Sequence, residues 1–166
     1  MKILTINTPI GEITYYDINS PIKLNTIRER LKELLEASIN ISPYCNQTSE
    51  DYLNIISYQL KKRNDDFRLF VMLNGAELIG FCAAFIVADN GVNGCLIYAA
   101  YTKPGLIHVI TKDMIRFLDI FAAHNLCKQM MFHTARDEKV FGRLLKKYGF
   151  KSKRTIFERE VDYAAR

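Results

Sequence analysis

The residues best suited to proton transfer in this sequence are its three histidines, because an imidazole titrates near neutral pH without help from its surroundings. His133 lies in the apolar stretch KQMMFHT, and His108 and His124 lie at the two ends of a long segment of periodic apolar residues. At His133 the alternatives are a general base and a partly buried, hydrogen-bonded ring. His124 suits a helix C-terminus, whereas His108 at a helix start favours contact with an anion.

The four cysteines form no metal-binding pattern. Cys45, Cys82, Cys95 and Cys127 are far apart and include no Cys-x-x-Cys pair, so we expect neither zinc nor another metal site. Cys82 and Cys95 lie in apolar, strand-like stretches, where free thiols are usually buried. A reactive thiol is the alternative. The sequence also lacks a Gly-rich phosphate loop, HExxH and Gly-x-Ser-x-Gly, which argues against the enzyme classes built on those motifs.

Positive charge is concentrated towards the end of the chain. The 166 residues carry a formal net charge of +5, and residues 141–166 hold eight Lys and Arg against three Asp and Glu, which accounts for all of it. Such a segment attracts anions: the phosphates of a cofactor, a nucleic acid or an acidic protein. The alternative is a solvated helix face followed by a charged edge strand. A nucleic acid ranks third among the partners considered, because only this segment favours it.

Composition and length predict one globular domain over 1–166. Hydrophobic residues make up 49% and charged residues 25% of the chain, which is ordinary for a protein with a sizeable core. No apolar run approaches the roughly 20 residues of a membrane span. The first residues alternate apolar and polar types, unlike a signal peptide. We therefore expect a cytoplasmic protein without membrane association.

The spacing of apolar residues predicts an alternation of strands and helices. The predicted elements are strands at 2–7 and 12–18, a helix after Pro21, a helix over TSEDYLNIISYQLKKR, strands near 67–73, 78–88 and 95–102, a helix over 106–123, a strand over KQMMFHT, a helix over DEKVFGRLLKKY and a last strand over RTIFEREV. Asn74–Gly75 indicates one turn, and Asn90–Gly91 with Asn93–Gly94 indicates another. Strand–helix–strand units imply parallel pairing and the meander implies antiparallel pairing. The predicted class is α/β (α+β), a mixed central sheet flanked by helices.

The stretch LLKKYGF at 144–150 predicts how the last helix ends. Lys146 and Lys147 complement the negative end of the helix dipole. Gly149 suits the left-handed conformation that follows many helices, and Phe150 supplies the apolar contact that accompanies it.

With this order of elements the chain resembles the GNAT superfamily of acyl-CoA-dependent N-acetyltransferases, with a β-α-α-β-β-β-α-β-α-β order. LIYAAYTKP is similar to the family's fourth strand and the proline-containing loop after it, and the helix over 106–123 is similar to the long helix that follows. FHTARDEKVFGRLLKKYGFK resembles the fifth strand, short helix and terminal Gly-Phe. Thr134–Ala135–Arg136 also resembles the T-x-R of divergent bacteriophage members, which would imply the host cytoplasm.

The resemblance implies acetyl-CoA as co-substrate and an amine as acceptor, with the pyrophosphate at the helix entrance and pantetheine along the fourth strand. The residues that it assigns to the cofactor are Ala99, Ala100, Lys103, Gly105, Leu106, Ile107, His108, Val109, Arg136, Lys139 and Arg143. Lys139 and Arg143 are like charges at i,i+4, which favours an anion between them. For catalysis, His133 would be the base, and Tyr98 and Tyr101 would orient water or substrate.

Two departures from the family pattern leave a second interpretation open. The motif Arg/Gln-x-x-Gly-x-Gly/Ala falls on Ile107, Ile110 and Thr111 or Lys112, and the usual tyrosine four residues before the terminal Gly is Leu145. The alternative is a non-catalytic GNAT-fold protein that binds a partner, such as a phage accessory or virion-associated protein. The acceptor and the oligomeric state stay open, although an exposed last strand favours edge-to-edge pairing.

Overall fold

The computed structural model describes residues 2–41, 46–62, 65–89, 91–132 and 138–151. The chain forms two compact units, Met1–Arg136 and Asp137–Arg166. The single domain expected over 1–166 stays a prediction. The last strand expected over RTIFEREV lies outside the described residues.

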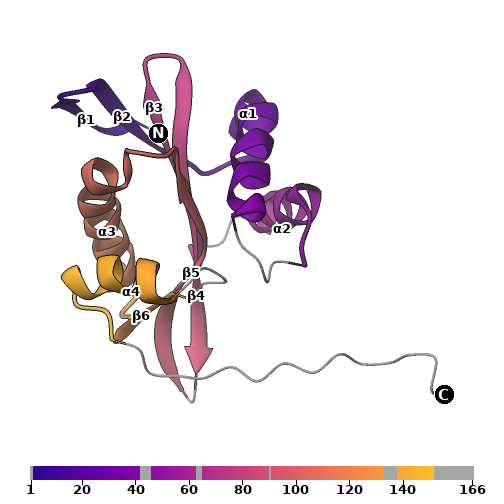
Figure 1. Cartoon of the computed structure of the whole chain (residues 1–166). Coiled ribbons are helices and arrows are strands. Elements are labelled where there is room, and N and C mark those ends of the chain that lie inside the picture. Colours follow the sequence, from indigo (N-terminus) through magenta and orange to yellow (C-terminus); the bar gives the residue numbers. More distant parts are fainter. Residues whose placement is uncertain (1, 42–45, 63–64, 90, 133–137, 152–166) are drawn as a thin grey trace, which may run out of the picture. The chain divides into compact units, whose positions relative to one another are not determined.

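The first unit is built around a mixed sheet of six described strands that lie in chain order (Figure 1). The strands are β1 (Lys2–Thr8), β2 (Gly11–Ile18), β3 (Phe67–Asn74), β4 (Glu77–Asp89), β5 (Val92–Thr102) and β6 (Gln129–Phe132). All neighbours pair antiparallel except β5 and β6, which are parallel. A parallel pair needs a crossover connection, and α3 (Ile107–His124) supplies it. The predicted mixed α/β class is confirmed.

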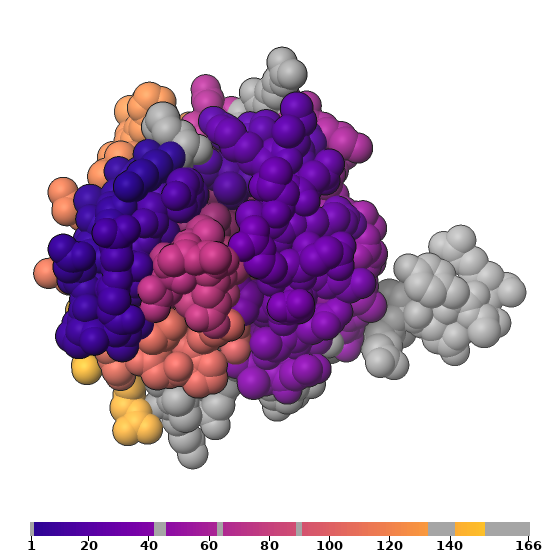
Figure 2. Space-filling model, turned by 90° about the horizontal axis from the view of Figure 1, so that it is seen from above, coloured from indigo at the N-terminus to yellow at the C-terminus, as the bar shows by residue number. Residues whose placement is uncertain are grey.

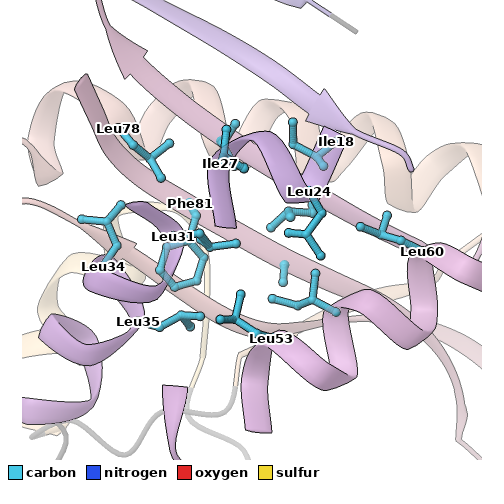
Figure 3. Packing of buried hydrophobic residues seen from close by; sticks show 14 of the residues in the cluster. Ile18, Leu24, Ile27, Leu31, Leu34, Leu35, Leu53, Leu60, Leu78 and Phe81 are labelled. Carbon is cyan, nitrogen blue, oxygen red and sulfur yellow. The ribbon is translucent and has the colours of Figure 1, made fainter. Parts of the chain in front are cut away.

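Helices cover both faces of this sheet (Figure 1). α1 (Pro21–Asn40) and α2 (Ser49–Lys62) pack on one face, and α3 packs on the other. The buried residues of α1 are the five that the apolar spacing predicts: Leu24, Ile27, Leu31, Leu34 and Leu35. Figure 3 shows them converging with Leu53 and Leu60 of α2 and with Phe81 of β4. In the described part of the chain, no helix is both long and apolar enough to cross a membrane.

The opposite face of the sheet is filled by α3. Phe117 lies with its ring centroid 5.1 Å from that of Tyr15 and 6.1 Å from that of Phe70. Ile110 and Leu118 are fully buried on the same helix. The central strands are therefore covered on both sides, which explains why β4 is an almost continuous apolar run instead of an alternating one.

Side chains define the starts of α1 and α2. Ser20 caps α1 by accepting a hydrogen bond from the N–H of Lys23 at 3.4 Å, and Pro21 occupies the first turn, where its missing N–H costs nothing. Thr48 and Asp51 cap α2 reciprocally: the Asp51 N–H donates to Thr48 Oγ1 at 3.2 Å, and the Thr48 N–H donates to Asp51 Oδ2 at 2.8 Å.

The second predicted turn is wrong only in part: Gly91, with a φ of 75°, lies in a turn, but Asn93–Gly94 does not. Gly75 has a φ of 58° in the β3–β4 turn, as expected. β5, however, begins at Val92, so Asn93 and Gly94 lie inside the strand and not in the turn before it. A Cβ at Gly94 would lie 2.7 Å from Met131 Cε. Gly94 pairs with Gln129 of β6, and the atom that a Cβ would meet is the far end of the flexible Met131 side chain, which can move.

The second unit contains α4 (Glu138–Lys147), which ends as the sequence predicts. Gly149 has a φ of 81°. The N–H of Phe150 donates to the carbonyl of Leu145 at 3.2 Å, and the N–H of Gly149 donates to that of Lys146 at 3.1 Å. These two bonds are the Schellman pattern that terminates a helix.

We predict that Leu31→Ala destabilises the fold and that Ile22→Ala does not. Leu31 is fully buried in the helix–sheet core, whereas Ile22 of the same helix is 78% exposed. Removing the buried side chain should lower the free energy of unfolding by about 2–5 kcal/mol. The exposed site should change it by no more than roughly 0.5 kcal/mol. Chemical denaturation of the two variants measures the difference, and equal losses would contradict the packing described.

Candidate active site

The central feature of the candidate site is an extra residue in β5. Ile97 pairs with Ala84 of β4, but Ala99 pairs with the next residue, Ala83, so Tyr98 is the residue at which the register shifts. A bulge of this kind breaks the alternation of faces. Tyr98 and Ala99 consequently both pack against the core cluster under α1 and α2, although they are adjacent in sequence.

β5 also extends past its pairing with β6. In the described residues the parallel ladder runs from Gly94 with Gln129 to Ile97 with Phe132. The strand then continues to Thr102. The bulge therefore coincides with the last pair, and the segment 98–102 leads away from it towards α3. His133, the predicted base, follows directly after β6 and lies outside the described residues.

The two predicted tyrosines have different surroundings. The Tyr98 hydroxyl is 3.2 Å from Gln47 Oε1, to which it donates, and its ring lies 5.3 Å from that of Tyr52 and 5.2 Å from that of Phe85. Tyr98 is half-buried. Tyr101 is only 8% exposed and belongs to the core cluster. Of the two rings, that of Tyr98 is the more accessible to a substrate.

The N-terminus of α3 has no side chain that caps it. Leu106 occupies the cap position and makes no side-chain hydrogen bond, and α3, all of which is described, has no acidic residue in its first turn. The N–H of Val109 donates to the carbonyl of Leu106 at 3.0 Å, which leaves the N–H groups of Ile107 and His108 without a partner in the helix. The helix dipole makes this end positive. Gly105, with a φ of 83°, has open space where a Cβ would be. This end of α3 is suited to an anion.

The remaining predicted residues near this helix start fall into two groups. His108 is exposed, whereas Ile107 and Val109 are half-buried. Ile110, where the family motif has a small residue, is fully buried in the core. Thr111 is also buried, and its hydroxyl donates to the carbonyl of Ile107. The bulky residues of this stretch therefore point largely into the core and leave His108 as the exposed side chain of the first turn.

The segment that joins β5 to α3 is held against the β3–β4 turn, and Figure 2 shows the two side by side on one face. The N–H of Lys103 donates to the carbonyl of Ile79 at 2.9 Å, and Lys103 Nζ forms an ion pair with Glu77. Lys103 is thus paired with Glu77, a neighbour that the sequence alone does not predict. Its predicted contact with a cofactor phosphate would compete with Glu77.

As cofactor contacts, four other predicted residues stay predictions. Arg136 lies outside the described residues, and of Lys139 only the backbone is described. Arg143 is exposed on α4, in the second unit. Ala100 pairs with Cys82 in the ladder between β5 and β4. Sequence analysis missed Gln47, Tyr52 and Phe85 as neighbours of Tyr98, because the bulge that aims Tyr98 at them has no mark in the sequence.

The cysteines of this unit are not built as nucleophiles. Cys82 and Cys95 are fully buried. Burial raises the pKa of the Cys95 thiol to about 12, and it also raises the pKa of Cys82 and of the half-buried Cys127. Since the thiolate is the reactive form, burial and a raised pKa together make Cys82 and Cys95 poor nucleophiles at neutral pH. The predicted burial of Cys82 and Cys95 is confirmed, and Cys45 lies outside the described residues.

Solved structures with this arrangement span nearly the whole chain. An aminoglycoside acetyltransferase, meta-AAC0020 from an uncultured soil metagenomic sample, is 12% identical with a TM-score of 0.67, covering 90% of this chain and 97% of that one. AAC(6')-Iy, in complex with the bisubstrate analogue CoA-S-monomethyl-acetylneamine, is 18% identical with a TM-score of 0.66, covering 90% and 99%. Glucosamine-6-phosphate N-acetyltransferase from Arabidopsis thaliana is 15% identical with a TM-score of 0.63, also covering 90% and 99%.

The chain has the GNAT acetyltransferase fold. No protein-family model and no curated protein matches the sequence. The likeness therefore lies in the arrangement of the elements and not in the residues. In the GNAT fold seen here, β5 corresponds to the predicted fourth strand, β6 to the fifth, and α3 to the long helix between them.

We predict that Cys82 and Cys95 resist alkylation in the folded protein. Both side chains are fully buried and held as thiols by their raised pKa. After iodoacetamide treatment at pH 8, peptide mass spectrometry should find these two positions unmodified. The same reaction in guanidinium chloride is the control and should modify both. Native labelling as fast as in denaturant would show that these thiols are accessible.

Proposed function

We propose that this protein is an acetyl-CoA-dependent N-acetyltransferase that acts on an amine. The observation that carries the proposal is the position of the uncapped N-terminus of α3 in a GNAT fold, directly after β5 and its bulge at Tyr98. Similar structures support the choice of co-substrate, since AAC(6')-Iy has been solved both with CoA and with a CoA-linked bisubstrate analogue.

The residues at the start of α3 fit a diphosphate. The unpaired N–H groups of a first turn and the helix dipole favour negative charge. Gly105 leaves the approach open, and exposed His108 is placed to add a donor. Lys103 would contribute only by exchanging Glu77 for a phosphate. When bound, acetyl-CoA would supply the activated acetyl thioester.

β5 is proposed to hold the pantetheine arm through its backbone. Ala99 and Ala100 have small side chains, which lets an extended chain approach the strand closely. The bulge at Tyr98 marks where β5 passes its last described pair with β6, at Ile97 and Phe132. A backbone N–H of this stretch would polarise the thioester carbonyl as charge develops on its oxygen.

Proton transfer is assigned to side chains near the bulge. His133 is proposed as the base that deprotonates the ammonium of the acceptor, because its intrinsic pKa suits the task. The Tyr98 hydroxyl is proposed to orient the acceptor or to return a proton to sulfur, in exchange for its bond to Gln47. Tyr101 is buried, and its proposed role is to fix the backbone of β5.

A second function is favoured by one specific observation. None of the residues aligned with the family's phosphate motif is glycine or alanine, and Leu145 takes the place of the usual tyrosine. This pattern favours a GNAT-fold protein that binds a partner without catalysis, for example a phage accessory or virion-associated protein. Binding of acetyl-CoA separates the two proposals.

We predict that acetyl-CoA stabilises the folded protein. At 100 times its dissociation constant a ligand that binds only the native state contributes about 2.7 kcal/mol. The measurement is a thermal-shift titration to millimolar acetyl-CoA, with free adenosine as a control ligand that lacks the diphosphate. Release of free thiol should then be assayed with a panel of amines that includes an aminoglycoside and glucosamine 6-phosphate. Absence of any stabilisation would refute the enzyme proposal and favour the non-catalytic one.

We predict that His108→Glu separates folding from co-substrate binding. A carboxylate in the first turn of α3 should stabilise the unliganded helix by about 0.3–1 kcal/mol through the dipole. The same charge should repel the diphosphate and weaken acetyl-CoA binding by tenfold or more. His108→Gln, which removes the imidazole without adding charge, is the matched variant and should lose much less affinity for acetyl-CoA. If calorimetry shows equal affinity for the two variants, the diphosphate does not bind at this helix end.

A further inference from the structure

The second unit carries a helix face of a single charge sign. Arg143, Lys146 and Lys147 are exposed on α4, and at 3.6 residues per turn they lie within an arc of about 100°. Lys151 is exposed just beyond the helix end. We call these four residues the α4 basic face. The one acidic residue of α4, Glu138, lies at the far end of the helix, two turns from Lys146.

The part of the chain before this face, residues 1–140, carries no net charge. Residues 1–140 carry equal numbers of basic and acidic residues, so the net charge of +5 resides entirely in 141–166. The excess of positive charge that would attract a polyanion therefore lies in this segment. Lys146 and Lys147 also suit the helix dipole, but the dipole gives no reason for Arg143 or Lys151.

The burial of the apolar side of α4 disfavours two kinds of partner, a lipid surface and a helix-binding groove. Leu144 is only 9% exposed, and Leu145 is half-buried. A lipid surface or a helix-binding groove would require the apolar side of an amphipathic helix to be available. The side that α4 offers to solvent is the basic one. It contains no Asn or Gln, the side chains that recognise adenine, and its Arg and Lys side chains can bind phosphate oxygens whatever the base sequence.

We propose that the α4 basic face binds the phosphate backbone of a nucleic acid without reading its sequence. The proposal is independent of acetyl transfer, because it uses a helix of the second unit and no residue of β5 or α3. Four cations would neutralise up to four phosphates. Binding to duplex DNA would then weaken with salt with a logarithmic slope of up to about −3.6, at about −0.9 per contact.

The test is fluorescence anisotropy of a labelled duplex of arbitrary sequence, titrated with the full-length protein at several salt concentrations. The variant Arg143→Gln/Lys146→Gln/Lys147→Gln should lose at least tenfold in affinity at low salt, and its slope should fall towards about −0.9. The matched control is Lys61→Gln/Lys62→Gln/Lys128→Gln. It lowers the net charge of +5 by the same three, at exposed positions that include the last turn of α2. It should change affinity less than twofold.

Four outcomes would overturn the proposal. One is the absence of DNA binding at low salt. Another is an equal loss of DNA affinity in the two triple variants, which would assign the attraction to net charge alone. Displacement of DNA by poly-glutamate at equal charge concentration would assign the face to an acidic protein. Saturating acetyl-CoA should leave DNA affinity unchanged, and competition would assign these cations to the co-substrate. Failure of the acetyl-CoA thermal shift would leave the DNA result intact, so the two proposals fail separately.

Discussion

The first unit depends on burying a sheet from both sides. β4 and β5 lie in the middle of the sheet, with α1 and α2 packed on one face and α3 on the other. Strands in that position have no solvent face on which to carry polar side chains. Polar and reactive side chains are therefore expected where the strands end. The candidate site lies at such a place, between the end of β5 and the start of α3. The same burial makes Cys82 and Cys95 unreactive.

Burial also explains which parts of the fold the sequence predicts. The stripe from Leu24 to Leu35 identifies α1 because each position faces the core, and the end of α4 at Gly149 follows from local backbone geometry. Local sequence signals fail to predict the structure of a segment where pairing with a strand distant in sequence determines it. Asn93–Gly94 has the composition of a turn, but it lies inside β5, where Gly94 pairs with Gln129 of β6. No local pattern could indicate that neighbour.

The candidate site was harder to predict for the same reason. Tyr98 and Tyr101 are both predicted to orient water or substrate, yet Tyr98 is half-buried beside Gln47 and Tyr101 lies in the core. Strict alternation along β5 would put these two residues on opposite faces. The extra residue in β5, which places them together, arises from the pairing with β4 and not from the residue types. The start of α3 was located correctly because a proline-containing loop and a periodic apolar segment mark it.

The bulge in β5 has a consequence for how this sequence can change over time. Deleting Tyr98 would remove the extra residue and leave a regular ladder, with Ile97 opposite Ala84 and Ala99 opposite Ala83. Ala99 and Tyr101 would then keep the faces that they have now. Adding one residue after the bulge would instead turn the later residues of the strand to the other face, and Tyr101 would leave the core. The bulge therefore gives the segment before α3 one residue that can be lost, but no room for one that is gained.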